Sequence, residues 1–487
     1  MLAHIPILIV VLPLVIAPVC LLFRSPEISK LLATIVSLFC VVGSLFLLDI
    51  TFSGTIINYE LGAWEPPWGI EYKIGLLGAL IATIVSIIGF ACVVFSITYN
   101  KHEIHEERSN KFYALLLLCL SGLLGMIMTN DIFNLFVFLE ISSLSSYALV
   151  ASSQKPKALW AAYRYLIAGT IGATFILLSI GMLYMMTGTL NMDDISSRLP
   201  DVHSSATTQA AFAFLTVGLS LKVALFPLHF WLPGAYTYAP SPISAFLAGT
   251  TTKVSLYVFI KFFFSLFGTE LTFNEINFEY IMGPLSAAAI ILASLSAIYQ
   301  TNIKRMLAYS SIAQLGYMTL GISMATKEGL SASIIHLTQH AFAKSALFLA
   351  LGCVIFKLGS ANLDNLKGLG RRMPITTAAI IVGGLSMIGI PLTGGFISKW
   401  YLIQAAMGAD LWLYAVTIVL GSVLALVYVG RVVELAFFKS SDEQLQLGEA
   451  PIALQAPVWL LLIANIYLGI FPDSIISVAR YIAEGLF

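Results

Sequence analysis

Seven ionisable side chains lie inside apolar stretches of this 487-residue chain. A charge at the centre of a bilayer costs about 2.5–3.5 kcal/mol on insertion scales. Five of the seven, one glutamate and four lysines, carry a formal charge. Together they cost about 12–18 kcal/mol, which is comparable to the stability of a whole domain. This cost indicates a functional requirement, and lysine, glutamate and histidine in such a setting indicate proton transfer. The candidate site residues are Glu140, Lys222, Lys253, His336, His340, Lys344 and Lys399.

Lys222 lies in an apolar run, residues 219–233, that Pro227 and Pro233 interrupt. Proline in a helix removes an amide donor and clashes with the preceding turn. In lipid, the freed backbone is tolerated only where protein or a water-filled cavity satisfies it. We expect Glu140 to lie at a similar depth and to pair with Lys222. We interpret this as an ion pair that opens and closes as a proton passes; the alternative is a static pair that joins two helices.

Four lysines and one glutamate would leave an excess of positive charge in the membrane if all were ionised. Burial and like-charge repulsion both disfavour the ammonium form. Some of these lysines should therefore be neutral part of the time, and a lysine that can lose its proton can carry one. Lys253 has hydroxyl residues beside it that could hold water, and Lys399 follows a second break at residues 389–395.

His336, His340 and Lys344 are spaced four residues apart, so their side chains share one face of a helix. Histidine titrates near neutral pH. We favour a proton relay over a metal site, because no carboxylate or cysteine lies nearby in the sequence. Inert buried histidines are a third interpretation. His229, beside the first break, is either a cap for freed carbonyls or a member of the relay.

The composition identifies a membrane protein that crosses the bilayer many times, since 59% of the residues are hydrophobic and 10% are charged. The formal net charge is zero, which argues against nucleic-acid binding. The five cysteines lie in apolar runs without metal-ligand spacing, so we interpret them as small hydrophobic residues. No nucleotide loop, iron–sulfur spacing or haem signature is present. We therefore expect no cofactor, no metal and no redox or hydrolytic chemistry in this chain, with energy supplied by an ion gradient or a partner.

About 20 apolar residues are needed to cross a membrane as a helix. On this measure the sequence holds about fourteen spans, of which the seventh and the twelfth are broken. The expected spans are roughly 3–23, 31–50, 74–98, 112–129, 131–152, 159–187, 208–232, 242–267, 279–299, 304–324, 329–357, 374–405, 411–436 and 455–475.

Lysine and arginine are distributed unequally between the two sets of alternate connections. One set holds fifteen of them and the other holds four. Because positive residues gather on the cytoplasmic side, we expect both termini on the outer side of a bacterial or archaeal plasma membrane. The first apolar run lacks a basic region before it and a cleavage site after it, so we interpret it as a retained span.

Five spans separate the two broken helices, and an odd offset makes them run in opposite directions across the membrane. Inverted repeats with one discontinuous helix in each half are a transporter architecture. The sequence also shows no long linker and no soluble domain, so we expect one integral membrane domain over residues 1–487.

Several motifs give the chain a resemblance to a known family, the antiporter-like subunits of Mrp-type cation/proton antiporters, respiratory complex I and membrane-bound hydrogenases. The resemblance extends over nearly the whole chain. Its most specific segments are 59–72, 131–140, 222–240, 304–311, 336–344 and 391–399. Three features favour the D-type member of an Mrp-type antiporter: a lysine at position 399, the short segment after the last span, and the 59–72 segment.

The resemblance implies an all-α fold of fourteen transmembrane helices, with inverted five-helix repeats formed by spans 4–8 and 9–13. The corresponding divisions are residues 1–110, 111–267, 279–436 and 455–487. It also implies a water-lined relay in which Glu140 and Lys222 are the coupling pair and Lys253 is the central connector. His336, His340 and Lys344 would continue the relay, and Lys399 would be its terminal residue.

The function that we predict is proton translocation in a multisubunit sodium (or potassium)/proton antiporter, with other membrane subunits as partners. One alternative is the same machinery in a complex I-like NADH:quinone oxidoreductase or a membrane-bound hydrogenase. A second is a stand-alone secondary transporter, which would transport its solute as a purified single chain. The insertion cost of the charges disfavours a structural scaffold.

Overall fold

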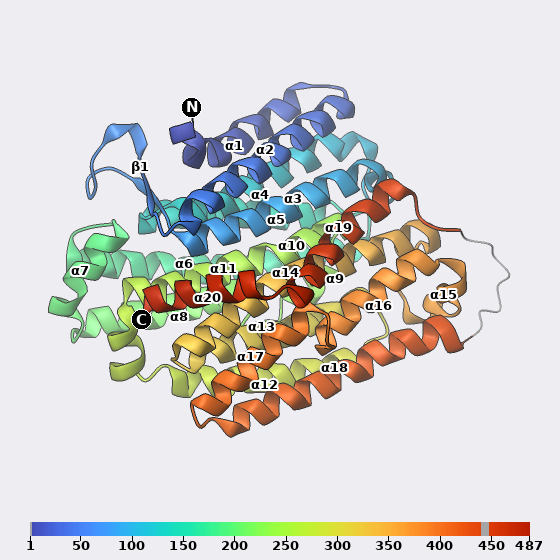
Figure 1. The fold of residues 1–487 in the computed structure, drawn as a ribbon. Coiled ribbons are helices and arrows are strands. Elements are labelled where there is room, and N and C mark those ends of the chain that lie inside the picture. Colours follow the sequence, from blue (N-terminus) through green and yellow to red (C-terminus); the bar gives the residue numbers. More distant parts are fainter. Residues whose placement is uncertain (1, 440–447) are drawn as a thin grey trace.

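The computed structural model of the chain describes residues 2–439 and 448–487. These residues are almost entirely helical, and most of the helices run side by side in one bundle (Figure 1). The chain termini, a small β-hairpin and the short helix α7 gather at one end of the bundle, which we call the hairpin end (Figure 1). The prediction of an all-α integral membrane fold is confirmed.

The elements follow one another in the order of their labels in Figure 1. The strands are β1 (Ile57–Glu60) and β2 (Glu71–Ile74). The helices of the first half are α1 (Ile5–Leu22), α2 (Pro26–Phe52), α3 (Leu76–Glu103), α4 (Ser109–Met128), α5 (Ile132–Ala151), α6 (Pro156–Thr187), α7 (Met192–Val202), α8 (Ala206–Val223), α9 (Leu232–Tyr238), α10 (Ser241–Gly249) and α11 (Thr251–Ile260), which η4 (Lys261–Leu266) continues. Those of the second half are α12 (Glu279–Ile298), α13 (Ile303–Ser323), α14 (Lys327–Leu358), α15 (Leu369–Arg372), α16 (Pro374–Ile388), α17 (Gly394–Gly408), α18 (Trp412–Phe438), α19 (Ile452–Ile470) and α20 (Asp473–Leu486).

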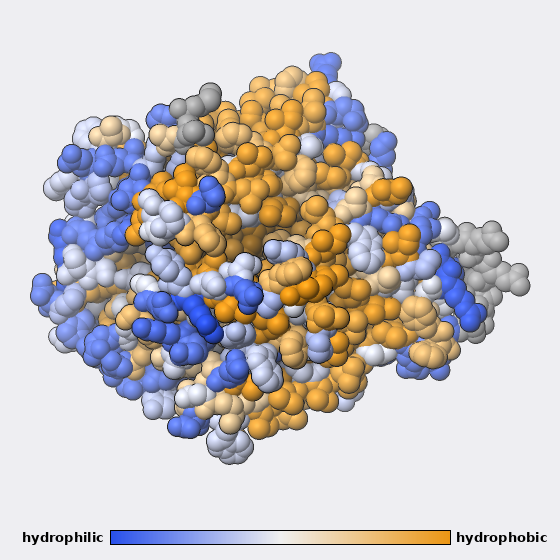
Figure 2. All heavy atoms as spheres, viewed as in Figure 1, coloured by the Kyte–Doolittle hydropathy of each residue, from blue (hydrophilic) through white to orange (hydrophobic). Residues whose placement is uncertain are grey.

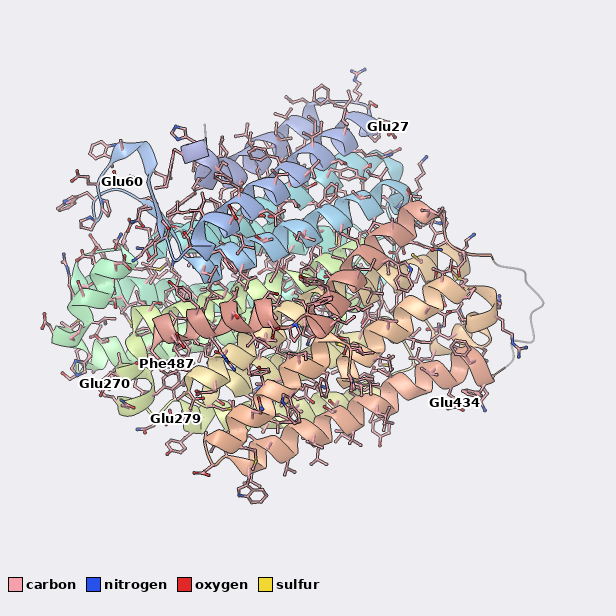
Figure 3. The ribbon with its side chains drawn as sticks, in the orientation of Figure 1. Glu27, Glu60, Glu270, Glu279, Glu434 and Phe487 are labelled. Carbon is pink, nitrogen blue, oxygen red and sulfur yellow. The ribbon has the colours of Figure 1, made fainter. Side chains whose placement is uncertain are left out.

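Twelve helical segments of the described residues are long and apolar enough to cross a membrane. The other two predicted spans coincide with α13 and with the successive helices α16 and α17. The count of fourteen and the inverted repeats stay predictions. An apolar surface covers the middle of the bundle, and hydrophilic residues gather toward its ends (Figure 2). Glu60, Glu270 and Glu279 lie toward the hairpin end, and Glu27 and Glu434 toward the opposite end (Figure 3).

The β-hairpin is held to the bundle by a buried carboxylate. Strands β1 and β2 pair antiparallel, with Glu60 opposite Glu71. One carboxylate oxygen of Glu71 accepts hydrogen bonds from the side-chain amides of Asn130 and Asn191, at 2.9 and 2.8 Å. Because these asparagines precede α5 and α7, the single carboxylate ties the hairpin to the start of two helices.

Both helix breaks lie where the sequence predicts them. Helix α8 ends at Val223 because Ala224 takes a left-handed conformation, with φ of +61°, and Pro227 follows. Helix α16 ends at Ile388, before Gly389 with φ of +92°. Glycine suits this position because it has no Cβ to clash in left-handed backbone.

Helix α14 is the centre of the bundle, and every residue from Gly329 to Ile355 in it is buried. Its neighbours include α10, α13, α16, α17, α19 and α20. Small residues allow the closest approach: a Cβ added to Gly249 of α10 would lie within 2 Å of the Ser345 hydroxyl oxygen of α14. The helix that carries three of the candidate residues is therefore shielded from the lipid by protein.

The last predicted span, residues 455–475, consists of part of α19 and the start of a further helix that we did not anticipate, α20. The apolar face of α20 packs along α14, where the Ser331 hydroxyl donates to the Ala479 carbonyl at 3.3 Å. Helix α20 extends toward the hairpin end and carries the C-terminus there (Figure 1).

Candidate functional site

Glu140 of α5 and Lys222 of α8 form an ion pair, as we predict from the sequence. The Lys222 Nζ lies 3.5 Å from a Glu140 carboxylate oxygen and donates a 2.8 Å hydrogen bond to the Ser143 hydroxyl. The Tyr147 hydroxyl lies 3.5 Å from the same nitrogen. The side chain of Lys222 is 7% exposed and that of Glu140 is 28% exposed, so the carboxylate is the more accessible partner.

Helix α5 is fixed in place at its start by Asp131. The Asp131 carboxylate accepts a 2.6 Å hydrogen bond from the backbone N–H of Asn134, which caps the helix. Because Glu140 follows on the same helix, the cap also sets the depth of the coupling pair.

A backbone carbonyl at the end of α8, beside Lys222, accepts a hydrogen bond from a tryptophan side chain. The indole Nε1 of Trp231 donates a 2.9 Å hydrogen bond to the Leu221 carbonyl, and its ring stacks on Tyr165 with centroids 4.1 Å apart. His229 does not fill this role: its ring stacks on Phe226, and its Nδ1 has no hydrogen-bond partner among the described residues. The sequence suggests His229 as a cap, and the structure assigns the bond to Trp231.

Lys344 lies on α14, which packs against α10 through Ser345 and Gly249, and Lys253 lies on α11, the helix that follows α10. The Lys253 Nζ donates to the Ala248 carbonyl at 2.5 Å and to the Thr252 hydroxyl at 3.2 Å. The Lys344 Nζ donates to the Leu307 carbonyl of α13 at 2.9 Å. Both lysines are almost fully buried and are held by neutral oxygens; no acidic side chain of the described residues forms an ion pair with them.

The two histidines of α14 are stacked along one helix face, with ring centroids 6.2 Å apart. His336 has partners on both ring nitrogens: the Ser398 hydroxyl and the Gln314 side-chain oxygen, each at 2.9 Å. Neither ring nitrogen of His340 has a hydrogen-bond partner among the described residues, although the side chain is fully buried. A buried polar group without a protein partner is usually satisfied by water.

His340 lies in the middle of α14, between His336 and Lys344 in the sequence. The titratable groups near enough to interact with its ring electrostatically come from three helices, α11, α14 and α17. They are Lys253, Lys344, His336 and Lys399.

Lys399 lies at the second break, near the start of α17. Its Nζ donates to the backbone carbonyls of Met387 and Ile388, at 2.8 and 3.0 Å, and contacts the Ser422 hydroxyl at 3.0 Å. The nitrogen also lies 4.7 Å from the centre of the Tyr317 ring, within the range of a cation–π contact. Lys399 thus satisfies carbonyls that the break in α16 leaves free. It also lines a cavity of about 280 Å³.

The structure adds buried polar residues that the sequence analysis missed. Lys304, the first residue of the predicted span 304–324, is 1% exposed and donates to the Ala239 carbonyl at 2.9 Å. Glu103 forms an ion pair with Lys155 at 2.6 Å and accepts from the backbone N–H of Ser241 at 2.7 Å. Asn302 caps α13, which places Lys304 in the first turn of the helix.

Lys261, the first residue of η4, is a further lysine with a backbone hydrogen-bond partner. Its Nζ donates to the Thr129 carbonyl just after α4, at 2.7 Å, and the residue lines a cavity at the hairpin end. Among the described residues, no group of three histidine, cysteine, aspartate or glutamate side chains is arranged to hold a metal ion.

Comparison with known proteins adds an independent line of evidence. A family model described as NADH:quinone oxidoreductase/Mrp antiporter, TM, matches residues 129–425, which contain all seven candidate residues. The chain is 38% identical to the N-type subunit of the NADH-quinone oxidoreductase of Desulforudis audaxviator, over 98% of each protein. It is 28% identical to the D-type subunit of the Na(+)/H(+) antiporter of Alkalihalophilus pseudofirmus, over 98% of this chain and 96% of that one.

The fold is similarly shared with a solved structure. A chain of the membrane-bound sulfane sulfur reductase, an archaeal respiratory membrane complex, matches with a TM-score of 0.90 at 31% identity, over 99% of this chain and 98% of that one. These similar proteins are subunits or chains of larger membrane complexes.

Proposed function

Because the chain belongs to the NADH:quinone oxidoreductase/Mrp antiporter family of membrane subunits, we propose that it moves protons across a membrane along its buried lysine, glutamate and histidine side chains. The observation that supports this most strongly is the Glu140–Lys222 ion pair beside the break in α8. A buried charge pair is a poor source of stability, because the cost of removing both charges from water offsets their attraction. The helix break beside it gives the pair an element that can respond to its state.

The proposed route starts at this pair and continues through residues whose nitrogens lie among neutral oxygens. Lys253 lies on α11, and His340 and Lys344 lie one turn apart on α14. Lys253 and Lys399 are both near enough to the His340 ring to interact with it electrostatically. His336 connects to α17 through Ser398, the neighbour of Lys399. Buried waters are proposed to join these groups, and the free nitrogens of His340 supply hydrogen-bonding positions for them.

In the proposed cycle, Lys222 is held by Glu140 while both are charged. Transfer of the Lys222 proton to a buried water on the way to Lys253 removes the attraction, so the pair separates and the local field changes. At an effective dielectric constant of 20, two unit charges at this separation interact by about 4–5 kcal/mol. A field change of this size is large enough to alter the protonation of the next lysine along the route.

Removing either partner of the pair tests the function. In inverted membrane vesicles that contain the assembled complex, Glu140→Ala and Lys222→Ala should each reduce gradient-driven proton movement to background. A matched control is the exposed pair of Glu434 and Lys439, whose atoms lie 3.6 Å apart and whose alanine variants should transport normally. Transport that persists in a well-assembled Glu140→Ala or Lys222→Ala variant refutes the proposal.

Two parent complexes fit this function. A sodium (or potassium)/proton antiporter is supported by the 28% identity to the antiporter relative and by the lysine at position 399. A redox-driven complex related to NADH:quinone oxidoreductase is supported by the higher identity, 38%, to the oxidoreductase relative. Purification of the chain with its partners separates the two, because iron–sulfur or flavin proteins accompany only the redox complex.

We further propose that the membrane is a bacterial or archaeal plasma membrane and that the hairpin end faces outward. The excess of lysine and arginine in the connections at the opposite end supports this orientation. A cysteine placed at Gly408, which is exposed and whose added Cβ meets no atom within 4 Å, should react with an impermeant thiol reagent in intact cells. Reaction only after the cells are broken contradicts the orientation.

A further inference from the structure

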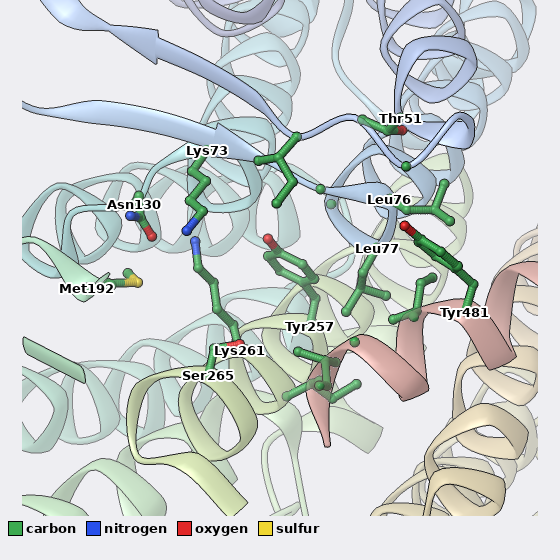
Figure 4. A pocket seen from close by; sticks show the side chains of 18 of the residues that line it. Thr51, Lys73, Leu76, Leu77, Asn130, Met192, Tyr257, Lys261, Ser265 and Tyr481 are labelled. Atoms are coloured by element: carbon green, nitrogen blue, oxygen red, sulfur yellow. The ribbon is translucent and has the colours of Figure 1, made fainter. Parts of the chain in front are cut away.

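A cavity of about 570 Å³ lies at the hairpin end of the bundle, apart from the coupling pair (Figure 4). Its walls come from the end of α2, the hairpin, the start of α3, the end of α11 with η4, and the C-terminal helix α20. Tyr481 of α20 forms part of the wall and lies against Gly54, where an added Cβ would be 2.8 Å from its hydroxyl oxygen. The cavity is therefore closed on one side by a helix that the sequence did not predict.

One wall of the cavity is charged. Lys73 and Lys261 extend toward one another across it, with their nitrogens at its edge (Figure 4). The Lys73 Nζ pairs with Asp193 at 2.5 Å, and the Lys261 Nζ donates to the Thr129 carbonyl at 2.7 Å. The Lys73 side chain is 34% exposed and that of Asp193 is 55% exposed, so water reaches this wall.

The inner end of the cavity approaches the buried relay. Tyr257 lines the cavity, and its hydroxyl donates to the Ile127 carbonyl at 3.0 Å. Lys253, Tyr257 and Lys261 are four residues apart, so they lie on one face of the same helix. A rise of 1.5 Å per residue places Tyr257 about 6 Å along the helix axis from Lys253.

We propose that this cavity is a second access route, which connects the hairpin end to Lys253 through Lys261 and Tyr257. The proposal rests on the proposed function, and it places an access route in the first half of the chain, apart from the cavity that Lys399 lines in the second. A proton that leaves the Lys253 ammonium passes to a water or to the Tyr257 hydroxyl, which releases its own proton toward a neutral Lys261. No electron transfer is involved, and reversal of the same steps carries protons inward.

A cysteine in the cavity wall tests the route in the assembled complex. Gly75 lines the cavity and has no atom within 4 Å of an added Cβ, whereas a Cβ at Gly78 would lie 3.4 Å from the Tyr257 hydroxyl, an ordinary contact. Gly75→Cys and Gly78→Cys are therefore expected to fold. The five native cysteines are buried, so the wild-type protein is a low-reactivity background.

The reagent is a small impermeant thiol reagent with a trimethylammonium group, applied to vesicles from the side on which it modifies the control variant Gly408→Cys. We expect it to modify Gly78→Cys and to slow proton movement at least about tenfold, because a fixed positive charge then blocks a proton-transfer step. Modified Gly408→Cys should transport normally. Tyr257→Phe, which keeps the ring and loses the hydroxyl, should also slow proton movement severalfold.

Two results overturn the route. Modification of Gly75→Cys and Gly78→Cys without any change in proton movement means that the cavity is wet but carries no protons. Reaction with a lipophilic maleimide but not with the charged reagent means that lipid fills the cavity. If Glu140→Ala still abolishes transport, either result contradicts only the access route and not the proposed function. Failure of the route can therefore be distinguished from failure of the function.

Discussion

The two broken helices each place a lysine beside interrupted backbone, but they stabilise its charge in different ways. At the first break, Lys222 faces the carboxylate of Glu140, and the freed end of α8 is satisfied by Trp231. At the second break, Lys399 itself donates to the freed carbonyls of Met387 and Ile388.

This difference assigns different properties to the two lysines. The charge of Lys222 is opposed by a full charge on another helix, so its protonation controls an attraction between helices. Lys399 is held by backbone dipoles, a hydroxyl and an aromatic ring, so its side chain also supports the local fold. The first break is therefore suited to switching and the second to receiving or releasing a proton at a fixed place.

The largest difference between the two breaks is expected in proton movement when the charge of Lys222, at the first break, is reversed. Lys222→Glu places two carboxylates together and should abolish proton movement. The double variant Glu140→Lys with Lys222→Glu restores opposite charges and should recover part of it. Proton movement in vesicles measures both, and a double variant no better than the single one contradicts a role for the pair as such.

The second prediction concerns stability at the two breaks. Lys399→Met leaves the Ile388 carbonyl without its side-chain donor and the Met387 carbonyl with only the 3.5 Å bond from Gln314, and an unsatisfied buried group costs about 1–3 kcal/mol. No backbone carbonyl depends on Lys222 for a hydrogen bond, so Lys222→Met should lower the thermal midpoint of the purified complex less. Equal losses in the two variants contradict the distinction between a paired and a capping lysine.

A smaller loss of stability is expected when Trp231, which caps the first break, is replaced. Trp231→Phe removes the hydrogen bond to the Leu221 carbonyl but keeps an aromatic ring against Tyr165. The expected loss of stability is about 1 kcal/mol, with proton movement largely retained. Trp412→Phe, at a position that is 59% exposed, is the control and should change neither the midpoint of unfolding nor transport.

The smallest effect should come from Ser422→Ala at the second break. The Lys399 Nζ keeps both of its carbonyl acceptors in this variant. We expect less than about 1 kcal/mol of destabilisation and proton movement close to that of the wild type. A loss as large as that of Lys399→Met would show that the hydroxyl, rather than the carbonyls, holds the lysine.

The sequence predicts the fold class, both breaks and the Glu140–Lys222 contact, because each depends on a local signal. Proline and glycine determine where α8 and α16 end, and a lone carboxylate in an apolar span has few possible partners. The burial of Lys304 could not be read in the same way, since its neighbour Arg305 makes the segment look like a connection.

Other features depend on contacts between distant parts of the chain. The cap from Trp231 depends on the path of the residues that follow the break. The place of α20 against α14 depends on tertiary packing, because its apolar face carries no information about which helix will cover it. The cavity at the hairpin end, which α20 helps to enclose, was for the same reason beyond sequence reasoning.

The most direct test of the account is proton movement by the purified complex in liposomes with His340 replaced by alanine. His340 is fully buried, has no protein hydrogen-bond partner among the described residues, and lies near both Lys253 and Lys399. If protons pass between the two halves through this ring, His340→Ala should reduce the pH change to that of empty liposomes while the complex stays assembled. A pH change equal to that of the wild type would contradict a relay through the centre of the chain.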